Sequence, residues 1–138
     1  MRLEPTVLSL VAGGLAAVLY LGLSAFQLAL AAGAPWGRAA FGGQHPGTLP
    51  ARLRVSSAVA TVVWAAVALI VARHAGLPVW APLPDAWLAV AVWVATALGV
   101  VAIALNALTP SRIERAIWLP ISVLLFSATA IVALSASG

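Results

Sequence analysis

Long apolar stretches separated by shorter polar segments dominate the pattern of this chain. Four of the stretches are long enough to cross the roughly 30 Å hydrocarbon layer of a bilayer as helices, which takes about 20 residues. None of them has an acidic residue or a lysine in its interior. Helices fit this setting and isolated strands do not, because backbone polar groups in lipid must be satisfied within the segment. The predicted spans cover residues 6–32, 54–71, 86–106 and 117–134.

Residues that start and stop helices mark the ends of these spans. Gly33 and Gly76 follow the first two spans and are the expected C-caps, each with a proline shortly after it. Asp85 precedes the third span and is the expected N-cap. Ser111 and Glu114 have the spacing of a capping box, in which the serine caps the helix and the glutamate returns a hydrogen bond. This pattern predicts that the fourth helix opens at Ser111.

The composition supports a membrane protein. The chain has 138 residues, of which 64% are hydrophobic and 7% are charged. A soluble domain is about half apolar and about a quarter charged, so this composition excludes an ordinary soluble enzyme and a disordered tail. The net charge of +4 comes from scattered arginines, without the basic stripe typical of nucleic-acid binding. We predict one domain over residues 1–138: an all-α, integral membrane four-helix bundle with a long Gly/Pro-rich first loop.

The residue types that are missing exclude several chemistries. The chain has no cysteine, which rules out disulfides, thiolate nucleophiles and iron–sulfur clusters, and no lysine, which rules out a Schiff base. His45 and His74 are the only histidines, and with three acids they offer too few ligands for a metal site. We expect neither a metal nor a cofactor. Arginine used without lysine, together with abundant alanine, suggests a bacterial origin.

The distribution of arginines predicts an orientation. In a four-span protein the first and third loops lie on one side of the membrane, and the termini and the second loop lie on the other. Five of the seven arginines fall on the first side, whereas Arg2 and Arg73 fall on the second. The positive-inside rule then places loops 1 and 3 in the cytoplasm and the termini outside, in the inner (plasma) membrane.

Polar residues gather in loops 1 and 3, which share one face of a four-span bundle. Arg52 and Arg54 fall at the start of a helix, where the macrodipole disfavours positive charge. Another interaction should favour them: the positive-inside preference, lipid phosphates, Glu114 or an anionic ligand. Gln27 lies about 8 Å along its helix from the end of the first span, near the same face. The candidate ligand-binding residues are Gln27, Trp36, Arg38, His45, Arg52, Arg54, Asn106, Arg112, Glu114, Arg115 and Trp118.

Three functional hypotheses follow from this face. The first is a small multi-pass membrane protein that binds an anionic amphipathic ligand, a lipid or a membrane partner there. The second is an oligomeric subunit of a transporter or channel, although no charged residue lies at mid-depth to carry a proton. The third is a lipid-directed enzyme with His45 and Glu114 as acid and base, which must then lie within hydrogen-bond reach, directly or through one water. We favour binding over catalysis.

Each candidate residue also has a purely structural interpretation. The arginines can anchor the protein at lipid headgroups, Glu114 can serve only as a helix cap, and His45 can be an ordinary turn residue. Interhelical hydrogen bonds can explain Gln27 and Asn106. The expected partners are the lipid bilayer, an anionic lipid or amphipathic ligand, and a second copy or another membrane protein, but not nucleic acid.

Overall fold

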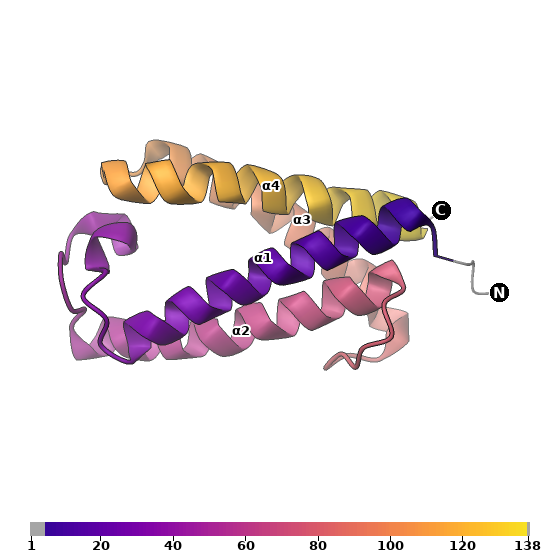
Figure 1. Cartoon of the computed structure of the whole chain (residues 1–138), viewed down its shortest axis with the longest axis horizontal. Helices are drawn as coiled ribbons and strands as arrows, with labels where there is room; N and C mark the ends of the chain where they lie inside the picture. The colour runs from indigo at the N-terminus through magenta and orange to yellow at the C-terminus, as the bar shows by residue number, and fades with distance from the viewer. Residues whose placement is uncertain (1–4, 138) are drawn as a thin grey trace.

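The computed structural model describes residues 5–137, and this part of the chain is helical, without strands (Figure 1). Its four long helices each have the length and the apolar composition to cross a membrane. They are α1 (Val7–Ala31), α2 (Ala51–Ala75), α3 (Asp85–Leu108) and α4 (Arg112–Ser137). The prediction of an all-α, four-helix membrane protein is confirmed. Arg2, which contributed to the orientation prediction, lies outside the described residues.

Three helices are longer than the predicted spans, α3 by only a few residues and α2 and α4 by more. α2 has Arg52 and Arg54 in its first turn and Arg73 in its last turn. α4 begins at Arg112, well before the predicted span and in agreement with the capping pattern. The difference arises because hydropathy marks only the segment that fits in hydrocarbon, whereas a helix continues into the headgroup region, where charged side chains are well solvated.

Glycines end α1 and α2 as the sequence predicts. Gly33 and Gly76 have φ angles of 103° and 111°, a left-handed conformation that glycine adopts without steric cost. After Gly33, the backbone N–H of Ala34 donates to the carbonyl of Ala29 at 2.9 Å, and the equivalent bond follows Gly76. These Schellman motifs satisfy carbonyl groups that the helix ends would otherwise leave without a donor.

The two ends of the bundle are different (Figure 1). The start of α1, the end of α4 and the α2–α3 turn lie at one end, which we call the terminal end. Loop 1 (residues 32–50) and the α3–α4 turn lie at the other, the loop-1 end. Loop 1 contains two short 3₁₀ turns, η1 (Gly37–Ala39) and η2 (Phe41–Gly43). The prediction that loops 1 and 3 meet at one end is confirmed, since Ser111 Oγ donates to the carbonyl of Arg38 at 2.6 Å.

Small side chains fill the half of the bundle nearest the terminal end. Ala16 of α1 and Ala75 of α2 are 0% and 1% exposed. Lipid gives little hydrophobic drive between helices, so close packing of small residues and interhelical hydrogen bonds must hold them together. Such bonds are present: Ser9 Oγ donates to the carbonyl of Ala75 at 3.0 Å, and the hydroxyls of Tyr20 and Thr129 lie 2.9 Å apart. This half is therefore closely packed.

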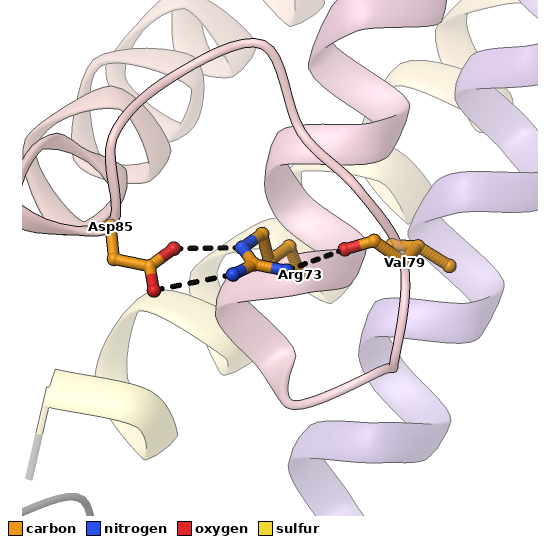
Figure 2. Close-up of polar contacts among 3 residues, drawn as sticks. All are labelled: Arg73, Val79 and Asp85. Carbon is orange, nitrogen blue, oxygen red and sulfur yellow. Dashed lines mark hydrogen bonds and ion pairs between the residues drawn. The ribbon is translucent and has the colours of Figure 1, made fainter.

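The α2–α3 turn is held by Arg73, which corrects the prediction that Asp85 is an N-cap (Figure 2). Pro84 occupies that position, and Asp85 is the first residue of α3. The Asp85 carboxylate accepts hydrogen bonds from Arg73 Nε at 2.7 Å and Nη2 at 3.2 Å, while Nη1 donates to the carbonyl of Val79 at 2.9 Å. A bidentate, charge-assisted pair is stronger than a hydrogen bond from a neutral backbone amide. The Asp85 carboxylate therefore binds Arg73 of α2 instead of capping α3.

Glycines allow the closest approaches between helices. Gly13 of α1 lies directly against α2, so that a Cβ atom there would overlap the Cβ of Ala75. A Cβ atom at Gly99 of α3 would lie 3.2 Å from Cδ2 of Phe126 on α4. Gly14, next to Gly13 in the sequence, has open space where its side chain would be. Gly13 therefore allows α1 to pack closely against α2, whereas Gly14 makes no such contact.

Gly13→Ala should lower the free energy of unfolding by about 1–3 kcal/mol, the usual cost of overpacking a close contact. The control is Gly14→Ala, which should leave stability unchanged or raise it slightly, because alanine favours a helix over glycine. Unfolding of both variants by heat or denaturing detergent in mixed micelles measures the difference. Equal stability of the two would contradict a close contact between α1 and α2 at Gly13.

Candidate functional site

A cavity of about 330 Å³ lies in the half of the bundle nearest the loop-1 end. All four long helices and loop 1 line this cavity, which we call the pocket. Apolar and aromatic residues surround its deep end, among them Tyr20, Trp64 and Leu125. Its outer end, towards loop 1, includes Phe41 and Glu114. The pocket is thus apolar at one end and polar at the other.

The long axis of the pocket follows the helices. On α3 its lining extends from Ala95 to Asn106, a distance of about 16 Å at roughly 1.5 Å per residue, and on α4 from Glu114 to Leu125, which gives the same length. Tyr20, at the deep end, lies near the middle of α1. Since the hydrocarbon layer is roughly 30 Å thick, the pocket has about the depth of one leaflet.

Four polar side chains line the outer part of the pocket: Gln27, Asn106, Glu114 and Ser122. Asn106 Nδ2 donates a hydrogen bond to Ser122 Oγ at 2.6 Å, which joins α3 to α4 and confirms that Asn106 has an interhelical role. Glu114 Oε2 accepts from the backbone N–H of Gly42 at 3.0 Å. Gln27 Oε1 is buried and has no hydrogen-bond partner within residues 5–137. A buried acceptor without a donor costs about 1–3 kcal/mol, so this oxygen gains if a ligand supplies one.

Aromatic side chains form much of the wall. The rings of Tyr20 and Trp64 stack with their centroids 5.7 Å apart at an interplanar angle of 13°. Phe26 meets Trp118 edge to face at 4.7 Å and 61°. The indole Nε1 of Trp118 donates to the carbonyl of Ala39 in loop 1 at 2.8 Å, which fixes the ring. Large rings at these positions hold the helices apart, and this makes room for the pocket.

Loop 1 is fastened across the outer end of the pocket by side chains from the start of α4 and the turn before it. Ser111 Oγ donates to the carbonyl of Arg38 at 2.6 Å, and Trp118 Nε1 donates to the carbonyl of Ala39 at 2.8 Å. The backbone N–H of Gly42 donates to Glu114 Oε2 at 3.0 Å. Phe41, which lines the pocket, has φ of 50°, and Gly42 and Gly43 follow with φ of 72° and 73°. A left-handed phenylalanine is strained, and such strain persists only where surrounding contacts enforce it.

The capping box at α4 forms only in part. Ser111 Oγ accepts from the backbone N–H of Glu114 at 3.1 Å, so the serine caps the helix as predicted. The backbone N–H of Ser111 donates to Thr109 Oγ1 at 3.3 Å, and the Glu114 carboxylate reaches Gly42 of loop 1 instead of returning to Ser111. Glu114 is therefore more than a cap, because it connects loop 1 to α4.

One side of the pocket reaches the outer surface of the bundle between α2 and α3. Val63 of α2 and Leu98 of α3 both line the pocket, yet they are 48% and 57% exposed. Both rim residues lie in helices that are long and apolar enough to span a membrane, on the side of the bundle and away from its ends.

The structure brings four of the predicted site residues together on the pocket: Gln27, Asn106, Glu114 and Trp118. Arg54 and Arg115 do not line it, because each serves a helix end. Arg54 Nε donates to the carbonyl of Ala31 at 3.1 Å, and Arg115 Nη1 donates to the carbonyl of Thr109 at 3.2 Å. A cation at the C-terminal end of a helix is favourable. The C-terminus of α1 therefore explains why Arg54 is tolerated at the start of α2.

The other predicted residues also lie outside the lining of the pocket. Arg38, Arg52 and Arg112 are exposed. The ring of Trp36 stacks on that of Phe26, a pocket residue, with the two centroids 6.2 Å apart. His45 lies in loop 1, and no hydrogen bond joins its side chain to Glu114 in the described part of the chain. A direct acid–base pair of these two side chains is therefore not present.

Some pocket residues were not predicted from the sequence. Ser122 is a single hydroxyl in an apolar part of the fourth span, and this isolation could have suggested a polar partner on another helix. Tyr20 and Trp64 carry no such signal, because their meeting depends on how α1 and α2 pack. Phe41 could not be predicted, because its position depends on a left-handed backbone that its sequence does not favour.

No family model, curated protein or solved structure matches this chain. The function therefore has to be argued from the pocket and from its place in the membrane.

Glu114→Ala should loosen loop 1, because it removes the acceptor for the Gly42 N–H. A hydrogen bond to a charged group contributes about 1.5–3 kcal/mol, so exchange of the Gly42 amide hydrogen should become roughly tenfold faster or more. Arg112→Ala is the control, since Arg112 lies in the same turn and is exposed. Hydrogen exchange in micelles measures both, and an unchanged rate in Glu114→Ala would contradict the proposed fastening.

Proposed function

We propose that this small multi-pass membrane protein binds an amphipathic molecule in the pocket. The apolar body of the ligand lies at the deep end, beside residues such as Tyr20 and Leu125. Its polar head lies at the outer end, near Gln27 and Glu114. The observation that carries the proposal is the polarity of the pocket along the bundle axis, which matches the orientation of a lipid in one leaflet.

The size and the surroundings of the pocket support this proposal. Ligand pockets usually have volumes of about 300–1,000 Å³ and are mostly apolar with a few polar groups, and the pocket meets this description. Its rim at Val63 and Leu98 lies on the side of the bundle, away from its ends. An amphipathic molecule already dissolved in the leaflet could therefore move in sideways, without bringing its apolar body into contact with water.

The positions of the arginines support a different role from the predicted binding of an anionic head. An anionic head held by Arg52, Arg54 and Arg112 is not supported, because none of the three lines the pocket. Arg52 and Arg112 are exposed at the loop-1 end, a position suited to contacts with lipid phosphates at the membrane surface. Anionic lipid is thus proposed as a surface partner, and the pocket as the site of the specific ligand.

The alternative hypotheses gain less support. A lipid-directed enzyme would need a base beside Glu114, and His45 is not on the pocket. An oligomeric transport or channel subunit stays a prediction, as does the orientation with loops 1 and 3 in the cytoplasm.

A photoreactive long-chain alcohol in nanodiscs tests whether the pocket binds an amphiphile. Labels should appear on Tyr20 and Leu125, which are 4% and 8% exposed and which lipid outside the bundle does not reach. Ala102→Phe should reduce this inward labelling severalfold, because the ring fills the pocket that Ala102 lines. Peptide mass spectrometry measures the labelled positions.

Ala104→Phe is the matched control, because Ala104 lies on the same helix at a similar depth but is exposed and does not line the pocket. It should leave inward labelling unchanged. Labels confined to outward residues in the unmodified protein would refute the proposal.

A further inference from the structure

We propose that the ligand has a cationic head that donates hydrogen bonds, such as a primary ammonium, and that Glu114 and Gln27 bind it. This inference rests on the proposed function, since it concerns the head of the same ligand. It reverses the sign of the head predicted from the sequence, because the pocket has a carboxylate where an anionic head would need a guanidinium.

The charged group that lines the pocket favours a cation. Among residues 5–137, Glu114 is the only acidic residue on the lining, and the arginines at the same end of the bundle do not line the pocket, nor does either histidine. Arg115, the nearest arginine on α4, donates to the carbonyl of Thr109. Within residues 5–137 the ion pair is between Arg73 and Asp85 at the terminal end, and Glu114 has no cationic partner. An anionic head would place a second negative charge beside the carboxylate.

The hydrogen-bonding groups at the outer end also favour a donor. Glu114 uses Oε2 for the Gly42 N–H, which is a neutral donor, and the carboxylate retains further acceptor positions. Gln27 Oε1, on α1, is a buried acceptor without a partner in the described residues. An ammonium group has three donors, enough for a bond to each of these two acceptors. A phosphate or carboxylate head can donate to neither when it is ionised.

The aromatic lining of the same end adds a third argument. Phe41 and Trp118 line the pocket beside Glu114. The face of an aromatic ring is negatively polarised and attracts cations, and tryptophan does so most strongly. Trp118 is held in place by its bond to the carbonyl of Ala39 and by the ring of Phe26. The outer end therefore combines an acid, a neutral acceptor and fixed aromatic rings.

Three amphiphiles with the same tail test the inference: dodecylammonium, dodecanol and dodecyl phosphate. Each competes with the photoreactive alcohol for Tyr20 and Leu125 in nanodiscs of zwitterionic lipid, at neutral pH. Dodecylammonium should displace the label at a concentration roughly tenfold lower than dodecanol, as expected for an added charge-assisted hydrogen bond. Dodecyl phosphate should be the weakest competitor.

Glu114→Gln should remove most of the preference for dodecylammonium and leave dodecanol unchanged. The glutamine keeps an oxygen that can accept from Gly42 N–H, so loop 1 stays fastened. Asp85→Asn is the control for net charge, because it makes the same change in charge at the terminal end of the bundle. It should retain the tenfold preference.

The outcomes separate the two proposals. Equal displacement by all three amphiphiles, or the strongest displacement by dodecyl phosphate, would overturn the cationic head while the pocket remains a binding site. An unchanged preference in Glu114→Gln would overturn the role of Glu114. Absence of labels on Tyr20 and Leu125, before any competitor is added, would overturn the proposed function itself.

Discussion

The structure depends on one constraint: helices in lipid gain little from burying apolar side chains against each other, so they approach closely only where the residues between them are small. In this chain the small residues are unevenly distributed. Alanine and glycine at positions such as Ala16, Gly13 and Ala75 bring α1 and α2 together near the terminal end. Nearer the loop-1 end, the larger side chains of Trp64 and Trp118 line the pocket. The bundle is closely packed near the terminal end and contains the pocket near the loop-1 end.

A pocket in a membrane protein needs a boundary on its aqueous side, and loop 1 supplies it. The loop is rich in glycine and proline, and part of it packs through Ala40 and Leu49, which form a small buried cluster with Leu30 of α1. Polar contacts from Ser111, Glu114 and Trp118 hold it to the start of α4. Of these three, Glu114 lies in the turn by which α4 exceeds the span predicted from hydropathy.

The sequence predicted the helices well because their signals are local. Hydropathy gives the spans, and Gly33, Gly76 and Ser111 mark ends through backbone conformation or a hydrogen bond a few residues away. It predicted the site less well because the partners of charged groups are distant in sequence. Arg54 was expected to bind an anion, yet it meets the end of α1, and Glu114 reaches loop 1. Apolar periodicity cannot reveal such pairings, and it does not indicate which tryptophans face inward.

Glu114 connects the two parts of the proposed mechanism. Its carboxylate has acceptor positions for the Gly42 N–H and for a ligand head at the same time, so one anion can hold both loop 1 and the head. A cation bound there would lie beneath the loop, in contact with the group that fastens it. Phe41, at the outer end of the pocket, is 41% exposed, and Val63 and Leu98 on the side of the bundle are 48% and 57% exposed. On this assignment the apolar tail can enter from the side of the bundle, while the head stays at the outer end beside loop 1.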